Sequence, residues 1–145
     1  MKKKKILIIG LGKIGFYHLK ALEKFHRKLD IYIYDKKKIN LEDLTLNKIV
    51  ILNNLKKNIN FDLVIISTSS KERFKIFQQL VNNNKVKKII FEKFVFSKKI
   101  EFLKTSKIIK NKKIKAWVNC LRREIQIFKT LKQRRFNQFK IIYQG

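Results

Sequence analysis

A cluster of glycines near the start of the chain constrains the fold more than any other feature. Three of the four glycines lie within residues 10–15, which have the sequence GLGKIG and directly follow the apolar run 6–9. A buried strand that leads into G-x-G-x-x-G and then a helix is the arrangement that holds the pyrophosphate of a dinucleotide. In it, Gly10 allows a tight turn, Gly12 lets phosphates approach the backbone, and Gly15 lets the helix pack against the strand.

The residues after this glycine loop fit the same arrangement. Apolar residues and a histidine recur at helical spacing and predict the inner face of an amphipathic helix. These residues are Ile14, His18, Leu22, Phe25 and Leu29. We expect the histidine to be a packed or capped residue rather than a catalytic base. A second strand is predicted at residues 31–34, and it ends in Asp35.

Asp35 is the candidate for binding the ribose of the cofactor. It lies about 20 residues beyond Gly15, where an acidic residue hydrogen-bonds the ribose hydroxyls. A carboxylate repels a 2′-phosphate, which favours NAD over NADP, but the lysines at 36–38 would offset that repulsion and leave NADP open. The alternative role of Asp35 is a cap at the end of the strand.

Length and composition indicate one globular domain. The chain has 145 residues, of which 45% are hydrophobic, and no apolar run approaches the roughly 20 residues that span a bilayer. The single cysteine, Cys120, excludes an internal disulfide and a cysteine metal cage, and no other residues have metal-ligand spacing. We therefore expect a cytoplasmic protein without a metal.

The formal net charge of +27 allows two explanations. A surface this basic attracts polyanions, so binding to nucleic acid or another polyanion is one hypothesis. The lysines are spread along the whole chain, however, and they accompany abundant isoleucine, asparagine and phenylalanine and no proline, which is the usage expected from coding biased towards A and T. The second explanation is favoured, and nucleic acid is not the expected partner.

The rest of the chain alternates between predicted strands and helices. Strands are expected at 48–52, 62–66, 87–91 and 113–118, and helices at 71–83 and 97–111, with a further helix at 122–132 and a strand at 139–143. Hydroxyls at 67–70 and Ser97 are expected to cap the two middle helices. The expected inward residues of those helices are Phe74, Phe77, Leu80, Val81, Ile100, Phe102, Leu103 and Ile108. The series predicts an α/β fold: a Rossmann doubly wound parallel sheet with helices on both faces.

Motifs at three later strand ends resemble those of the glucose–fructose oxidoreductase and inositol dehydrogenase family, usually written Gfo/Idh/MocA. In that family a strand is followed by Ala-Thr-Pro-x-x-x-His, where this chain has Ser67-Thr68-Ser69 and Arg73. The next strand ends in Glu-Lys-Pro, where this chain has Glu92-Lys93-Phe94. Residues 119–123 match the family's Asn-x-x-Arg-Arg stretch. In this segment the chain resembles the polysaccharide-biosynthesis members of the family.

The resemblance implies roles for individual residues. Lys93 would be catalytic or would orient the substrate, a sugar or sugar nucleotide, together with Asn119 and Arg122. The candidate cofactor-binding residues, from the loop and from the resemblance together, are Gly10, Gly12, Lys13, Ile14, Gly15, Asp35, Ser67, Thr68 and Glu92. The implied reaction is the transfer of a hydride between a nicotinamide cofactor, NAD or NADP, and a secondary alcohol or ketone.

The resemblance also implies that the chain covers only part of a family member. Residues 1–118 would form the dinucleotide-binding domain, and residues 119–145 a connecting helix and the first strand of a substrate domain that is otherwise absent. Whether so short a chain is catalytically competent stays open. The alternatives are a non-catalytic dinucleotide-binding module and one half of a split enzyme, whose partner would be a second copy or a complementary chain with the missing domain.

Overall fold

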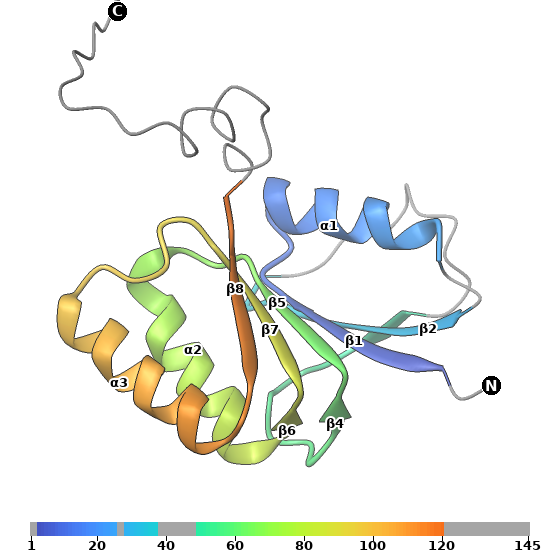
Figure 1. The fold of residues 1–145 in the computed structure, drawn as a ribbon. Helices are drawn as coiled ribbons and strands as arrows, with labels where there is room; N and C mark the ends of the chain where they lie inside the picture. Colours follow the sequence, from blue (N-terminus) through green and yellow to red (C-terminus); the bar gives the residue numbers. More distant parts are fainter. Residues whose placement is uncertain (1–2, 26–27, 38–48, 121–145) are drawn as a thin grey trace, which may run out of the picture.

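Six parallel strands form the main sheet of the computed structural model, which describes residues 3–25, 28–37 and 49–120 (Figure 1). The order across the sheet is β3-β2-β1-β5-β7-β8. The bounds of these strands are Lys4–Ile9 for β1, Leu29–Tyr34 for β2, Ile49–Ile51 for β3, Leu63–Ile66 for β5, Lys88–Glu92 for β7 and Lys115–Asn119 for β8. The chain starts in the middle of the sheet, winds to one edge and then crosses back to the other, as the doubly wound fold requires.

Three helices cover the two faces of this sheet. Helix α1, Lys13–Glu23, lies on one face, and helices α2, Ser70–Asn83, and α3, Lys99–Asn111, lie on the other (Figure 1). A small second sheet pairs β4, Asn60–Phe61, with β6, Lys85–Val86. None of the helices among the described residues is long and apolar enough to cross a membrane.

Alternating residues of the central strands supply two separate hydrophobic cores. On β1, Leu7 and Ile9 are buried among residues of α2, whereas Ile8 is buried with Leu19 of α1. A parallel strand that is buried on both faces needs apolar residues at successive positions, which is why runs such as 63–66 carry no polar residue. The expected fold class and the expected helices on both faces are confirmed.

The helix caps differ from the prediction. Ser69 is the residue that precedes α2, but its side chain makes no capping hydrogen bond. Lys98, not Ser97, precedes α3, and the Glu101 carboxylate accepts the Lys98 N–H at 3.3 Å. The Ser97 hydroxyl instead donates to the Ser70 hydroxyl. The predicted hydroxyl caps were wrong; the Ser97 hydroxyl bonds to Ser70, and the Ser67 hydroxyl bonds to the glycine loop.

The inward faces of two helices were also partly wrong. In α1 the buried residues are Gly15 and Leu19, while Ile14 is 46% exposed. Phe25 is 59% exposed, and Leu29 lies in β2 rather than in the helix. In α3, three residues predicted to face inward are about half exposed, and Thr105 is the buried one; the exposed residues are Ile100, Phe102 and Leu103. In α2, Phe77, Leu80 and Val81 are buried as predicted.

Candidate functional site

The glycine loop lies at the carboxyl end of β1, and each of its glycines has a different environment. Gly10 has a φ of +88°, in the left-handed region, and a Cβ there would lie 2.9 Å from the Thr68 side chain. A Cβ on Gly15 would lie 1.9 Å from the Gly10 carbonyl oxygen. Gly12 has ordinary backbone angles, and a Cβ there would meet no atom within 4 Å. Gly10 and Gly15 are therefore required by the fold, whereas Gly12 borders open space.

The first turn of α1 faces this open space with unpaired N–H groups. The Phe16 N–H donates to the Gly12 carbonyl at 2.9 Å and is the first bond of the helix, so the N–H groups of Lys13, Ile14 and Gly15 have no acceptor within the helix. The first turn has no acidic residue and no capping side chain. A helix start with these properties attracts an anion such as a pyrophosphate.

The Asp35 carboxylate braces the glycine loop. One oxygen accepts the Leu11 N–H at 2.6 Å, and the other accepts the Lys37 N–H at 2.9 Å. Asp35 thus does cap the end of its strand. A carboxylate has about four lone-pair directions, so two remain for ribose hydroxyls. A cavity of about 270 Å³ lies beside it, lined by Ile9, Gly10, Tyr34, Asp35, Lys36, Lys37, Thr68, Glu72 and Ile76.

One lysine that follows Asp35 is already paired. The Lys36 ammonium lies 2.5 Å from the Glu72 carboxylate across the mouth of this cavity. The hydrogen bond to Glu72 raises the pKa of Lys36. The ion pair with Glu72 therefore makes Lys36 a weaker partner for a 2′-phosphate. Lys37 also follows Asp35 and has no ion pair among the described residues. Lys38 lies outside the described residues.

Ser67 and Thr68 follow β5, next to the glycine loop. The Ser67 hydroxyl donates to the Gly10 carbonyl at 2.7 Å and also lies 3.2 Å from the Ile9 carbonyl. Its hydrogen is thus used to hold the loop. The Thr68 methyl packs against Gly10, and its buried hydroxyl has no hydrogen-bond partner among the described residues. The Ser67 hydroxyl therefore holds the glycine loop in place, and Thr68 lines the cavity.

Glu92, at the end of β7, joins three elements. Its Oε1 atom lies 2.7 Å from His18 Nε2 and accepts the Asn119 Nδ2–H at 2.6 Å. Glu92 is only 8% exposed, so these bonds replace water around the carboxylate. His18 comes from α1 and Asn119 from the end of β8. The predicted site residues Glu92 and Asn119 are thereby brought together at the carboxyl ends of the strands, the end of the sheet that carries the glycine loop.

Arg73 of α2 is buried beneath the segment that follows β7. It is 2% exposed, and its two terminal nitrogens donate to four backbone carbonyls, those of Thr68, Glu92, Phe94 and Val95. Burial lowers the pKa of its guanidinium, and the Glu92 charge partly opposes that effect. Arg73 replaces the histidine of the family motif and ties the end of β5 to residues 92–95.

The remaining predicted residues have fewer contacts. Lys93 is exposed directly after β7, and its peptide bond to Phe94 is cis. Arg122, the predicted helix at 122–132, the predicted strand at 139–143 and the proposed start of a second domain lie outside the described residues. Within the described ranges, no three histidine, cysteine, aspartate or glutamate residues are grouped as metal ligands would be.

Two residues of this region were not predicted as parts of the site. His18, expected to be a packed or capped residue, is half-buried and contacts Glu92. Arg73 was noted only as the replacement for a histidine, without a role. The sequence does contain one indication of a role for Arg73, which is its place among the apolar positions of α2. An arginine buried there requires several hydrogen-bond acceptors.

Comparisons with known proteins identify the family of the chain. Residues 4–120 match the model of the Gfo/Idh/MocA family, described as an oxidoreductase family with an NAD-binding Rossmann fold. No match was found among curated proteins.

Solved structures show the same fold. The WlbA dehydrogenase from Chromobacterium violaceum, in complex with NADH and UDP-GlcNAcA, superposes with a TM-score of 0.75 at 18% identity, over 92% of this chain and 39% of that one. The scyllo-inositol dehydrogenase from Lactobacillus casei, with bound NAD(H) and scyllo-inositol, gives a TM-score of 0.71 at 18% identity, over 91% and 40%. The myo-inositol 2-dehydrogenase from Lactobacillus plantarum gives 0.73 at 18% identity, over 91% and 40%. The chain thus spans about two fifths of the length of these structures.

Proposed function

Because the chain belongs to the Gfo/Idh/MocA family of oxidoreductases with an NAD-binding Rossmann fold, we propose that it is the cofactor-binding part of a sugar or sugar-nucleotide oxidoreductase. The pyrophosphate of the cofactor binds over Gly12, against the free N–H groups at the start of α1. The Asp35 carboxylate binds the adenosine ribose. The nicotinamide lies towards Glu92 and Lys93, at the end of β7.

The observation that carries this proposal is the contrast between Gly12 and its neighbours. Folding alone explains Gly10 and Gly15, because a side chain at either position would overlap other atoms. At Gly12 a side chain would have room, so the absence of one is explained by a ligand that needs the backbone uncovered. The unpaired N–H groups and the free lone pairs of Asp35 border the same space.

The proposed chemistry is hydride transfer to or from a secondary alcohol carbon. The nicotinamide supplies the hydride chemistry when it is bound, and the protein positions it and handles the proton. Lys93 is the candidate for holding the substrate oxygen or its proton, since it is exposed at the carboxyl ends of the strands, as the glycine loop is. His18 is less suited to this role because its Nε2 atom is already paired with Glu92.

A second candidate function is a dinucleotide-binding module without catalysis of its own. The observation that favours it is the small number of free reactive side chains around the end of β7, among the described residues. Lys93 is exposed there, but His18 and Asn119 both bond to Glu92. Such a module would bind NADH with the same contacts. It would differ from the first candidate only in turnover with added sugar or sugar-nucleotide substrates.

The test is a fluorescence titration of the chain with NADH and with NADPH at moderate salt. We expect saturable binding that favours NADH and is lost in Gly12→Val, because the added side chain would cover the phosphate site. The matched control is Ala21→Val, which adds the same branched side chain to an exposed position of α1. Equal affinity for NADH in both variants and the unaltered chain would refute the proposed site.

A further inference from the structure

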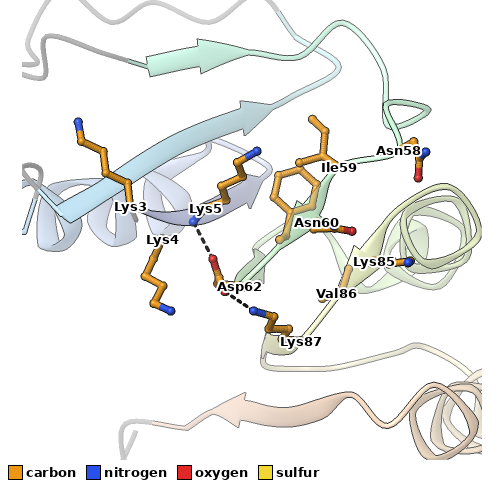
Figure 2. Close-up of a pocket in the computed structure, with 11 residues that line it drawn as sticks. Lys3, Lys4, Lys5, Asn58, Ile59, Asn60, Asp62, Lys85, Val86 and Lys87 are labelled. Carbon is orange, nitrogen blue, oxygen red and sulfur yellow. Dashed lines mark hydrogen bonds and ion pairs between the residues drawn. The ribbon is translucent and has the colours of Figure 1, made fainter. Parts of the chain in front are cut away.

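A second cavity lies at the opposite end of the sheet from the glycine loop, where the parallel strands begin. It has a volume of about 550 Å³ and is lined by residues 3–5, 58–62 and 85–87, at the amino ends of β1, β4, β6 and β7 (Figure 2). Strand β1 separates it from the glycine loop, and its six residues span about 20 Å at ~3.3 Å per residue. The cavity is therefore not part of the proposed NAD site.

Lysines from two segments surround this cavity. Lys3, Lys4 and Lys5 lie on one side of it and Lys85 and Lys87 on the other, with Asp62 between them (Figure 2). Among the residues that line it, Asp62 is the acidic one, so positive charge is in excess. A concave surface with charge of one sign focuses the electric field and concentrates counter-ions.

The Asp62 carboxylate does not neutralise this excess. One of its oxygens accepts the Lys5 N–H at 3.0 Å, and the other lies 2.8 Å from the Lys87 ammonium. These two contacts hold the pKa of Asp62 below its usual value. Among the described residues, the ammonium groups of Lys3, Lys4 and Lys85 have no carboxylate within ion-pair distance.

The floor of the cavity is largely apolar. The half-buried side chains of Ile59 and Val86 contribute to it. The Phe61 ring lies beneath them in the core, 1% exposed, and is fixed by an edge-to-face contact with Tyr32 at 5.5 Å between ring centres. The side-chain amides of Asn58 and Asn60 border it. An apolar floor, neighbouring amides and a cationic rim suit a ligand with a flat organic part and several negative charges, and the volume suits a molecule of nucleotide size.

We propose that this cavity binds a phosphorylated small molecule of nucleotide size, with its phosphates on the lysine rim and its organic part on the floor formed by Ile59 and Val86. The site is distinct from the NAD site and does not depend on it. A small ligand is favoured over nucleic acid because the lysines lie around one concavity of about 550 Å³ rather than along an extended groove.

The test uses ATP as the probe, titrated by calorimetry at about 0.15 M salt, where long-range attraction between exposed charges is screened. NADH is added in excess to occupy the glycine loop, where the proposed function would also allow ATP to bind. Under this condition we expect one saturable site for ATP. The double variant Lys4→Gln/Lys85→Gln should weaken ATP binding about tenfold, which corresponds to about 1.4 kcal/mol for two cation–phosphate contacts. Inorganic tripolyphosphate should bind more weakly than ATP, because it has no part that can contact the floor.

The control is Lys75→Gln/Lys104→Gln, which removes the same charge from exposed positions of α2 and α3. ATP affinity within about twofold of the unaltered chain in this control supports the proposal. An equal loss in both double variants would mean that the net charge alone attracts ATP and would overturn it. Unchanged ATP binding in Lys4→Gln/Lys85→Gln would place ATP elsewhere, with the same consequence.

Discussion

Arg73 allows the sharpest test of how the segment after β7 is held. We predict that Arg73→Met lowers the free energy of unfolding by about 3 kcal/mol. The variant leaves four carbonyls without their donor, one in a buried and three in part-buried hydrogen bonds, and a fully buried unsatisfied group costs about 1–3 kcal/mol. The total is smaller than the sum because removing a buried guanidinium also removes its desolvation cost, which is several kcal/mol. For a chain of this size the loss corresponds to a fall in Tm of roughly 10 °C.

The measurement is urea unfolding followed by far-ultraviolet circular dichroism, with Lys75→Met as the control. Lys75 is exposed on the same helix, so its replacement should change stability by no more than about 0.5 kcal/mol. Arg73→Lys should lie between the two, because one ammonium has three donors and cannot reach four carbonyls. If Arg73→Met lost less than about 1 kcal/mol, the four hydrogen bonds would not hold this segment as described.

Three further predictions concern other parts of the molecule. Asp35→Ala should weaken NADH binding by about tenfold and NADPH binding less, since a ribose hydrogen bond to a charged group contributes about 1.5 kcal/mol; unchanged affinity for both cofactors in fluorescence titration would remove Asp35 from the site. Gly15→Ala should lower the free energy of unfolding by more than about 3 kcal/mol, because its methyl would lie 1.9 Å from the Gly10 carbonyl oxygen. A normal thermal unfolding curve for that variant would contradict the packing described. Asp62→Asn should lower stability by less than about 1 kcal/mol at pH 7. Because folding lowers the pKa of Asp62, its stabilising effect exists above the unfolded-state pKa and disappears as the pH falls through the folded-state pKa, so urea unfolding near pH 2 should show no difference, and a persistent difference would count against the ion pair with Lys87.

The parallel sheet and the glycine loop could be predicted because their sequence patterns have few alternatives. Residues 63–66 are a short continuous apolar run, which suits a parallel strand buried on both faces. The loop glycines have no substitute where φ is positive or where a helix must touch a strand. Asp35 was located by its distance from the loop, and its carboxylate does bond the loop backbone.

The buried faces of the helices were harder to predict for a compositional reason. In α3, isoleucine, phenylalanine and leucine occur on several sides of the helix, so hydrophobic spacing does not select one face. Packing against the sheet selects Thr105 instead and leaves Phe102 exposed. The pairing of His18 with Glu92 and of Arg73 with distant carbonyls depends on which helices the sheet brings together. Such pairings are properties of the tertiary fold and have no local pattern in the sequence.

The space around the three loop glycines also limits how far the composition of this chain can drift. A coding bias towards lysine, isoleucine, asparagine and phenylalanine can replace residues wherever a larger side chain fits. At Gly10 and Gly15 the backbone leaves no room, so these glycines would persist even in a descendant that had lost its ligand. Gly12 has room for a side chain and would be the first of the three to be replaced after such a loss. The proposed function gives a reason for a glycine at this position, because the phosphates of the cofactor need the backbone uncovered.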